Sequence, residues 1–169
     1  MQNNVHVFSL QKKFQRHAHK AAQAATACLF VLGKKDAEVD VYLIDEKKMR
    51  ELNKKFRRHD TSTNVLSFEE PKGFPCPERH AKRGGVKLGE IYLAPDYIER
   101  KEENIGHLVI HGILHLLGYT HEGVRDRIEM EKKETYVQSF NLPGYRLGKY
   151  KRGGNGERKR RSCNVHLGV

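Results

Sequence analysis

The segment HLVIHGILHLLGYTHE, residues 107–122, is the part of the chain that most restricts its fold. Its apolar residues recur at helical spacing as far as Leu117, and Gly118 can take the left-handed conformation that ends a helix. His111 and His115 are four residues apart, which places both on one face of that helix. The turn at Gly118 is predicted to bring His121 back toward these two histidines.

Three histidines that meet in this way are typical of a metal site. Imidazole nitrogens bind zinc, and three protein ligands leave the fourth tetrahedral position for water, as in catalytic rather than structural sites. We therefore predict one zinc ion per chain, held by His111, His115 and His121. His107 lies one turn earlier on the same stripe, where we expect it to support a ligand rather than to be one.

The same histidine and glycine spacing occurs in the metzincin zinc proteases, whose motif is HExxHxxGxxH. In that motif the glutamate after the first histidine activates water, but in this chain the corresponding residue is Gly112. A zinc-dependent peptidase, or another zinc hydrolase of small substrates, is therefore the alternative hypothesis rather than the leading one. A non-catalytic RNA-binding or ribosome-binding module with a structural zinc is a third.

The charge of the chain points to a polyanionic partner. The 169 residues carry a net charge of +11, and residues 148–169 alone hold seven lysines and arginines against one acid. No amphipathic apolar face accompanies these charges, so nucleic acid is favoured over membrane. A purely solubilising tail is the alternative interpretation of 148–169.

Composition also restricts the compartment. No apolar run approaches the roughly 20 residues that cross a bilayer, and the first residues lack the layout of a secretion signal. The three cysteines, Cys28, Cys76 and Cys163, are scattered and odd in number, which favours a reducing compartment. We expect a cytoplasmic protein with no membrane partner.

The periodicity of the remaining segments predicts a single α+β domain, a small mixed β-sheet with helices packed against it, in the order β-α-β-α-β-β-α-α. The expected strands are 5–10, 37–45, 63–68 and 86–94, and the expected helices are 12–32, 46–56, 96–117 and 122–140. A proline-rich and glycine-rich loop is expected at 69–85. The domain is expected to span 1–147, followed by a basic, disordered tail at 148–169.

Three blocks of the sequence together resemble the YbeY family of metal-dependent endoribonucleases. They are HGILHLLGYTH at 111–121, LNKKFRRHDTSTNVLSF at 52–68 and LGEI at 88–91, against the family patterns HGxLHLxGYDH, LNxxYRxxDxPTDVLSF and LGDI. The blocks occur in the family's order and spacing, and the resemblance extends over nearly all of residues 5–140.

The resemblance implies a single-strand-specific, zinc-dependent endoribonuclease that acts in ribosomal RNA maturation and ribosome quality control. It implies that His111, His115 and His121 hold the zinc and that Arg57 is the family's functional arginine. We therefore assign catalysis to Arg57 and His111. The residues expected to bind RNA are Arg57, Arg58, Lys149, Lys151 and Arg152. Ribosomal RNA and the ribosome, with contacts to ribosomal proteins, are the expected partners.

None of the departures of the chain from the family patterns is at a proposed ligand. Thr120 and Asn64 stand where the family has aspartate, Ser62 where it has proline, and Phe56 where it has tyrosine. Arg57 suits the expected chemistry because a guanidinium can clamp a phosphate through two parallel hydrogen bonds. The sequence leaves open whether the nucleophile is a metal-bound water or the 2′-hydroxyl of the substrate.

Overall fold

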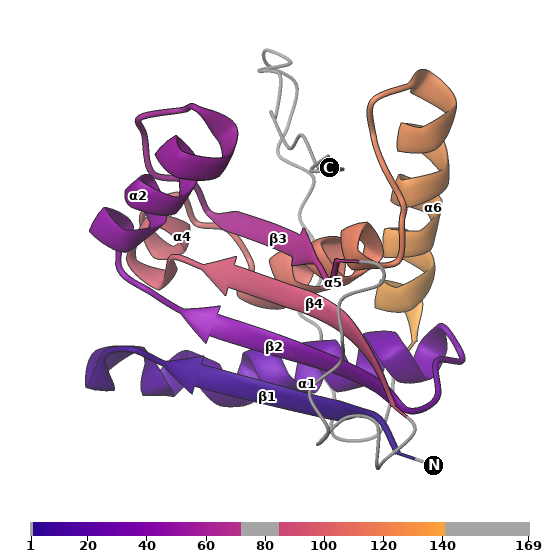
Figure 1. The fold of residues 1–169 in the computed structure, drawn as a ribbon. Helices are drawn as coiled ribbons and strands as arrows, with labels where there is room; N and C mark the ends of the chain where they lie inside the picture. Colours follow the sequence, from indigo (N-terminus) through magenta and orange to yellow (C-terminus); the bar gives the residue numbers. More distant parts are fainter. Residues whose placement is uncertain (1, 72–84, 141–169) are drawn as a thin grey trace.

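Figure 1 shows a computed structural model of the chain, and the structure describes residues 2–71 and 85–140. The elements are β1 (Asn4–Ser9), the 3-10 helix η1 (Lys12–Phe14), α1 (Gln15–Val31), β2 (Ala37–Leu43), α2 (Glu46–Arg57), β3 (Val65–Glu69), β4 (Val86–Leu93), α4 (Pro95–Arg100), α5 (Ile105–Leu116) and α6 (Val124–Ser139). The predicted α+β class and order of elements are confirmed. Most of the predicted loop 69–85, and all of the tail 148–169, lie outside the described residues.

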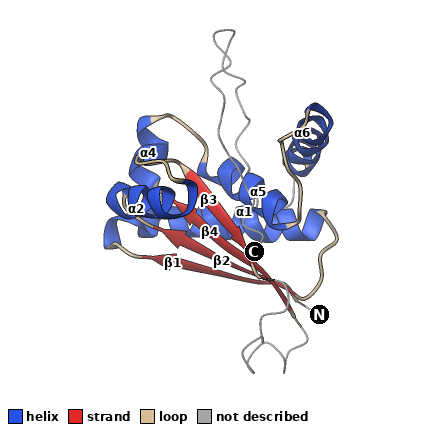
Figure 2. Ribbon diagram, turned by 45° about the horizontal axis from the view of Figure 1, so that its top comes forward, coloured by secondary structure: helices blue, strands red, loops and turns tan. Residues whose placement is uncertain are grey.

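The four strands form one mixed sheet in the order β1-β2-β4-β3. β1 pairs with β2, and β2 with β4, in parallel, whereas β3 pairs with β4 in the antiparallel direction. Helices α1 and α5 lie along one face of this sheet (Figures 1 and 2). A parallel pair needs a covering connection between its strands, and α1 provides it between β1 and β2.

The main core fills the space between the sheet and the helices α1 and α5. α1 contributes small side chains, so its backbone can lie close to its neighbours; the buried ones are Ala21, Ala24, Ala25, Ala27 and Cys28. α5 contributes large aliphatic side chains to this core: Leu108, Val109, Ile110, Ile113, Leu114 and Leu116. A smaller cluster joins α2 to the sheet through Met49, Ile44, Leu66 and Ala94.

The single helix expected at 96–117 is divided in two. Pro95, not Asp96, opens α4, and the chain leaves the helical path after Arg100, with Glu102 at φ +53°. Asn104 then caps α5, because its side-chain oxygen accepts hydrogen bonds from the backbone N–H groups of Gly106 and His107 at 2.9 and 3.4 Å. The break lets α5 start in a new direction along the sheet.

None of the helices in the two described segments is both long enough and apolar enough to span a membrane.

Gly112 marks the closest approach of α5 to the sheet. A Cβ atom added there would meet three side-chain carbons of Ile91, on β4, at 3.0, 3.2 and 3.3 Å. Ile91 is fully buried, so it has no free space into which it can withdraw. The absence of a side chain at 112 therefore fixes how close α5 lies to β4.

Replacing Gly112 with alanine should destabilise the fold. We expect the free energy of unfolding to fall by about 1–2 kcal/mol, even though alanine favours a helix over glycine by roughly 1 kcal/mol. Adding Ile91→Val, which removes the nearest carbon, should make the double variant less destabilised than the sum of the two single changes. Denaturant unfolding of the four proteins measures this coupling, and strictly additive losses would contradict the close contact.

Candidate metal centre

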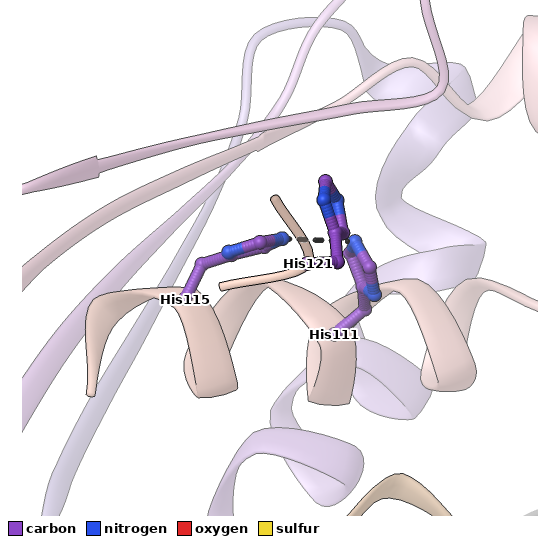
Figure 3. A group of neighbouring side chains, drawn as sticks. All are labelled: His111, His115 and His121. Carbon is purple, nitrogen blue, oxygen red and sulfur yellow. Dashed lines mark hydrogen bonds between the residues drawn. The ribbon is translucent and has the colours of Figure 1, made fainter. Parts of the chain in front are cut away.

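The structure brings His111 and His115, on α5, together with His121, which follows the turn after the helix (Figure 3). Gly118 has φ +86°, the left-handed conformation that the sequence predicted for it. Its N–H donates to the carbonyl of His115 at 2.8 Å, and that of Tyr119 donates to the carbonyl of Leu114 at 3.0 Å. These two bonds close the helix and reverse the chain, as in other glycine-terminated helices.

The separations among the three imidazoles suit a single ion. Each histidine offers one ring nitrogen, and these three nitrogens all lie within 4.8 Å of one another. Nε2 of His111 and Nε2 of His115 are 3.1 Å apart. Two nitrogens bound to the same tetrahedral zinc at 2.0–2.1 Å are separated by about 3.3 Å, so the observed spacing needs little adjustment to accommodate a metal.

The protonation of the site also fits a metal. The pKa of His115 is lowered to about 3. Burial is the largest cause, and the charges of the neighbouring His111 and His121 are the next largest. The imidazole is therefore neutral near pH 7, which is the form that binds metals. Nε2 of His121 is buried and has no hydrogen-bond partner among the described residues. A buried polar atom without a partner is costly, and metal coordination is one way to satisfy it.

Glu134, on α6, lies behind His111 and was not identified from the sequence. Its Oε1 atom is 2.6 Å from Nδ1 of His111, and both side chains are mostly buried. Because a carboxylate only accepts hydrogen bonds, Nδ1 carries a proton, and in the neutral ring the lone pair is then on Nε2, on the side of His115. This carboxylate–histidine pairing commonly accompanies histidine ligands in metal sites.

His107 lies outside the group of three histidines and contacts Glu134 from the other side. Its Nε2 is 3.9 Å from Oε2 of Glu134, and its Nδ1 is hydrogen-bonded to the side-chain amide of Gln138. His107 therefore occupies the supporting position expected from the sequence, one layer farther from the site than His111.

Arg57 approaches the same site from α2. It is the last residue of that helix and is half-buried, and it is close enough for its positive charge to contribute to the low pKa of His115. Arg58 follows at φ +59°, ends the helix and is exposed. Asn53 anchors the chain that follows, because its side-chain amide donates to the carbonyl of Thr61 at 2.7 Å.

The remaining predicted site residues, Lys149, Lys151 and Arg152, lie outside the described residues.

Two of the departures from the family patterns have clear structural roles. Phe56 packs against Phe68 with ring centroids 4.9 Å apart, and Asn64 donates to Glu103 at 2.8 Å. Ser62 has a buried hydroxyl without a partner among the described residues.

A second group of possible metal ligands, His6, Glu38 and Asp40, lies on β1 and β2. One of its two carboxylates is already paired with a cation of the protein, since Nζ of Lys87 is 3.1 Å from Asp40. His6 is also half-exposed. These features favour a surface ion-pair network over a metal site.

The fold and the site together define a small α+β domain with a candidate metal centre of three histidines near an arginine. The family model described as Endoribonuclease YbeY matches residues 1–140. Endoribonuclease YbeY of Aquifex aeolicus is 37% identical over 138 residues, covering 76% of this chain and 86% of the relative. That of Anaeromyxobacter dehalogenans is 35% identical over 158 residues, covering 86% and 77%. The chain belongs to the YbeY family.

A solved structure is also similar to the chain. The solution structure of a Thermotoga maritima protein matches with a TM-score of 0.46 and 26% identity, covering 79% of this chain and 87% of that one.

Substituting the three histidines should separate ligands from neighbours. We expect purified wild-type protein to contain close to one metal ion per chain, and His115→Ala and His121→Ala to lose most of it. His107→Ala should keep most of the metal, because that imidazole is not in the group of three. Elemental analysis measures the content; loss of metal from His107→Ala with retention in His121→Ala would show that the ligand set is wrong.

Acid should destabilise the metal-free protein through His115. In the unfolded chain this histidine takes up a proton near pH 6.5, but in the folded protein only near pH 3, so falling pH favours unfolding across that interval. Between pH 7 and pH 4 we expect the wild type to lose on the order of 3 kcal/mol more stability than His115→Gln. Denaturant unfolding at several pH values tests this, and parallel pH profiles for the two proteins would refute it.

Proposed function

We propose that the protein is a zinc-dependent endoribonuclease that cuts single-stranded ribosomal RNA in the cytoplasm. The observation that carries the proposal is the group of His111, His115 and His121, with Arg57 near enough for its charge to act on His115. The names of the family and of the relatives support RNA as the substrate. The net charge of +11 supports a polyanionic partner.

In this mechanism the histidines hold the metal and Arg57 holds the substrate. A bound zinc ion would polarise a phosphoryl oxygen or lower the pKa of a bound water. The guanidinium of Arg57 pairs with the scissile phosphate through two hydrogen bonds and stabilises the charge that develops on it. Burial around His115 keeps the site dry enough for these electrostatic interactions to be strong.

A peptidase of the metzincin type is disfavoured by the position of residue 112. The glutamate base of that motif would occupy the place of Gly112, which lies against the buried side chain of Ile91. There is no room at this position for a carboxylate that could reach a metal-bound water. The structure thus gives a packing reason for the glycine.

The cations at the periphery are proposed to bind phosphates without reading bases. Arg58 is exposed next to Arg57, and the basic segment 148–169 contains Lys149, Lys151 and Arg152. Ribosomal proteins are proposed as additional contacts in the ribosome, since the same cations can pair with acidic surfaces.

The substrate class is tested by incubating metal-loaded protein with single-stranded RNA, the matching RNA duplex and casein, each with and without a chelator. We expect internal cleavage of the single strand only, and no cleavage in the presence of chelator. Cleavage of casein with intact RNA would instead support the peptidase hypothesis.

The role of Arg57 is tested by substitution. Arg57→Ala should lower kcat/KM for RNA by at least about 100-fold at unchanged metal content and melting temperature, because one donor to the developing charge is lost. Arg57→Lys should recover little, since a point charge does not reproduce the two parallel bonds. Lys55→Ala, an equal loss of charge on the same helix, is the control. Normal turnover in Arg57→Ala would transfer the role to Arg58.

The basic segment is tested by comparing the full chain with residues 1–147 over a salt series. Each phosphate neutralised on a single strand contributes about −0.7 to the slope of log affinity against log salt, so three or four contacts account for roughly two to three units. Removing the segment should flatten the slope for long RNA and leave cleavage of a short oligonucleotide intact. An unchanged slope would assign the segment a role other than RNA binding.

A further inference from the structure

We propose that Glu134 is a positioning residue that fixes the imidazole of His111 for metal binding and thereby connects the metal centre to α6. The inference rests on the proposed function only in requiring that His111 is a metal ligand. It does not depend on which RNA is cut or on the route of cleavage.

The first step concerns the tautomer of His111. With Oε1 of Glu134 at 2.6 Å from Nδ1, the ring must donate through Nδ1, so in the neutral ring Nε2 carries the lone pair. Nε2 is the nitrogen that lies 3.1 Å from Nε2 of His115, at the centre of the group. Removing the carboxylate removes the acceptor that selects that tautomer, so part of the preorganisation of His111 for metal binding would be lost.

The second step concerns what holds Glu134 itself. Met130 and Val137 are the buried residues of α6, and they lie one turn before and one turn after Glu134. The carboxylate therefore shares the face by which α6 docks, and is directed to α5 by the same packing. Gln138, on that face as well, binds His107 of α5.

The third step follows from the small size of this docking face. Most other side chains of α6 are exposed, so the two apolar anchors and the polar pair of Glu134 and Gln138 supply much of its attachment to the domain. A carboxylate that stabilises His111 is equally stabilised by it. Metal binding, which requires His111 in the selected tautomer, should therefore also strengthen the docking of α6.

The experiment compares the wild type with Glu134→Gln and with a control, Glu129→Gln, which removes the same charge from an exposed position on α6. Zinc affinity is measured by competition with a chromophoric chelator. We expect Glu134→Gln to bind zinc 10- to 100-fold more weakly, and Glu129→Gln to match the wild type. Glu134→Asp, which keeps the carboxylate on a shorter side chain, should fall between them.

A second measurement does not require the variants to be equally stable. Nitrogen NMR of metal-free wild-type protein reports which ring nitrogen of His111 is protonated, and we expect Nδ1. Amide hydrogen exchange should also slow in α6 when zinc is added to the wild type, and less so in Glu134→Gln.

The outcomes separate this inference from the proposed function. Protonation of Nε2 in the wild type, or equal zinc affinity in Glu134→Gln and the wild type, would overturn the role of Glu134 while leaving the metal site in place. Failure of the wild type to bind zinc would overturn the zinc site of the proposed function instead.

Discussion

The contact between Gly112 of α5 and Ile91 of β4 is the constraint on which the rest of the structure depends. A helix that touches a sheet at one glycine has little freedom to rotate, because any turn about its axis would bring a larger side chain into that gap. The rotation of α5 then decides which of its residues face the core. His111 and His115 are brought to the edge of the core, where they are shielded from water yet able to meet His121.

Two electrostatic requirements coexist in the molecule and act over different distances. The excess of lysine and arginine attracts a polyanion from several ångströms away, and this attraction weakens as the salt concentration rises. The three histidines need an environment that disfavours positive charge on their rings, since protonated rings would repel one another and any metal ion. Burial supplies that condition at His115, while the carboxylate of Glu134 orients His111 by accepting a hydrogen bond from its Nδ1.

The strands, most of the helices and the histidine group could be predicted because each has a signal within a few consecutive residues: period-two alternation, period-3.6 recurrence, or the HGILHLLGYTH spacing. The division between α4 and α5 was missed because Ile98 and Ile105 are seven residues apart, a spacing that also fits one face of a continuous helix, and the cap at Asn104 is a single residue. Glu134 was missed for a different reason. Its partner is 23 positions away on another helix, and the direction of its side chain depends on how Met130 and Val137 dock. The proximity of Arg57 to the site likewise could be inferred only from the resemblance to the family.

The position of Glu134 near the end of the described chain has a consequence for biosynthesis. During translation the three histidines leave the ribosome before α6 does, so for a time the nascent chain holds all three imidazoles of the site but not the carboxylate behind His111. The site therefore reaches its final geometry only after α6 has been made and has docked.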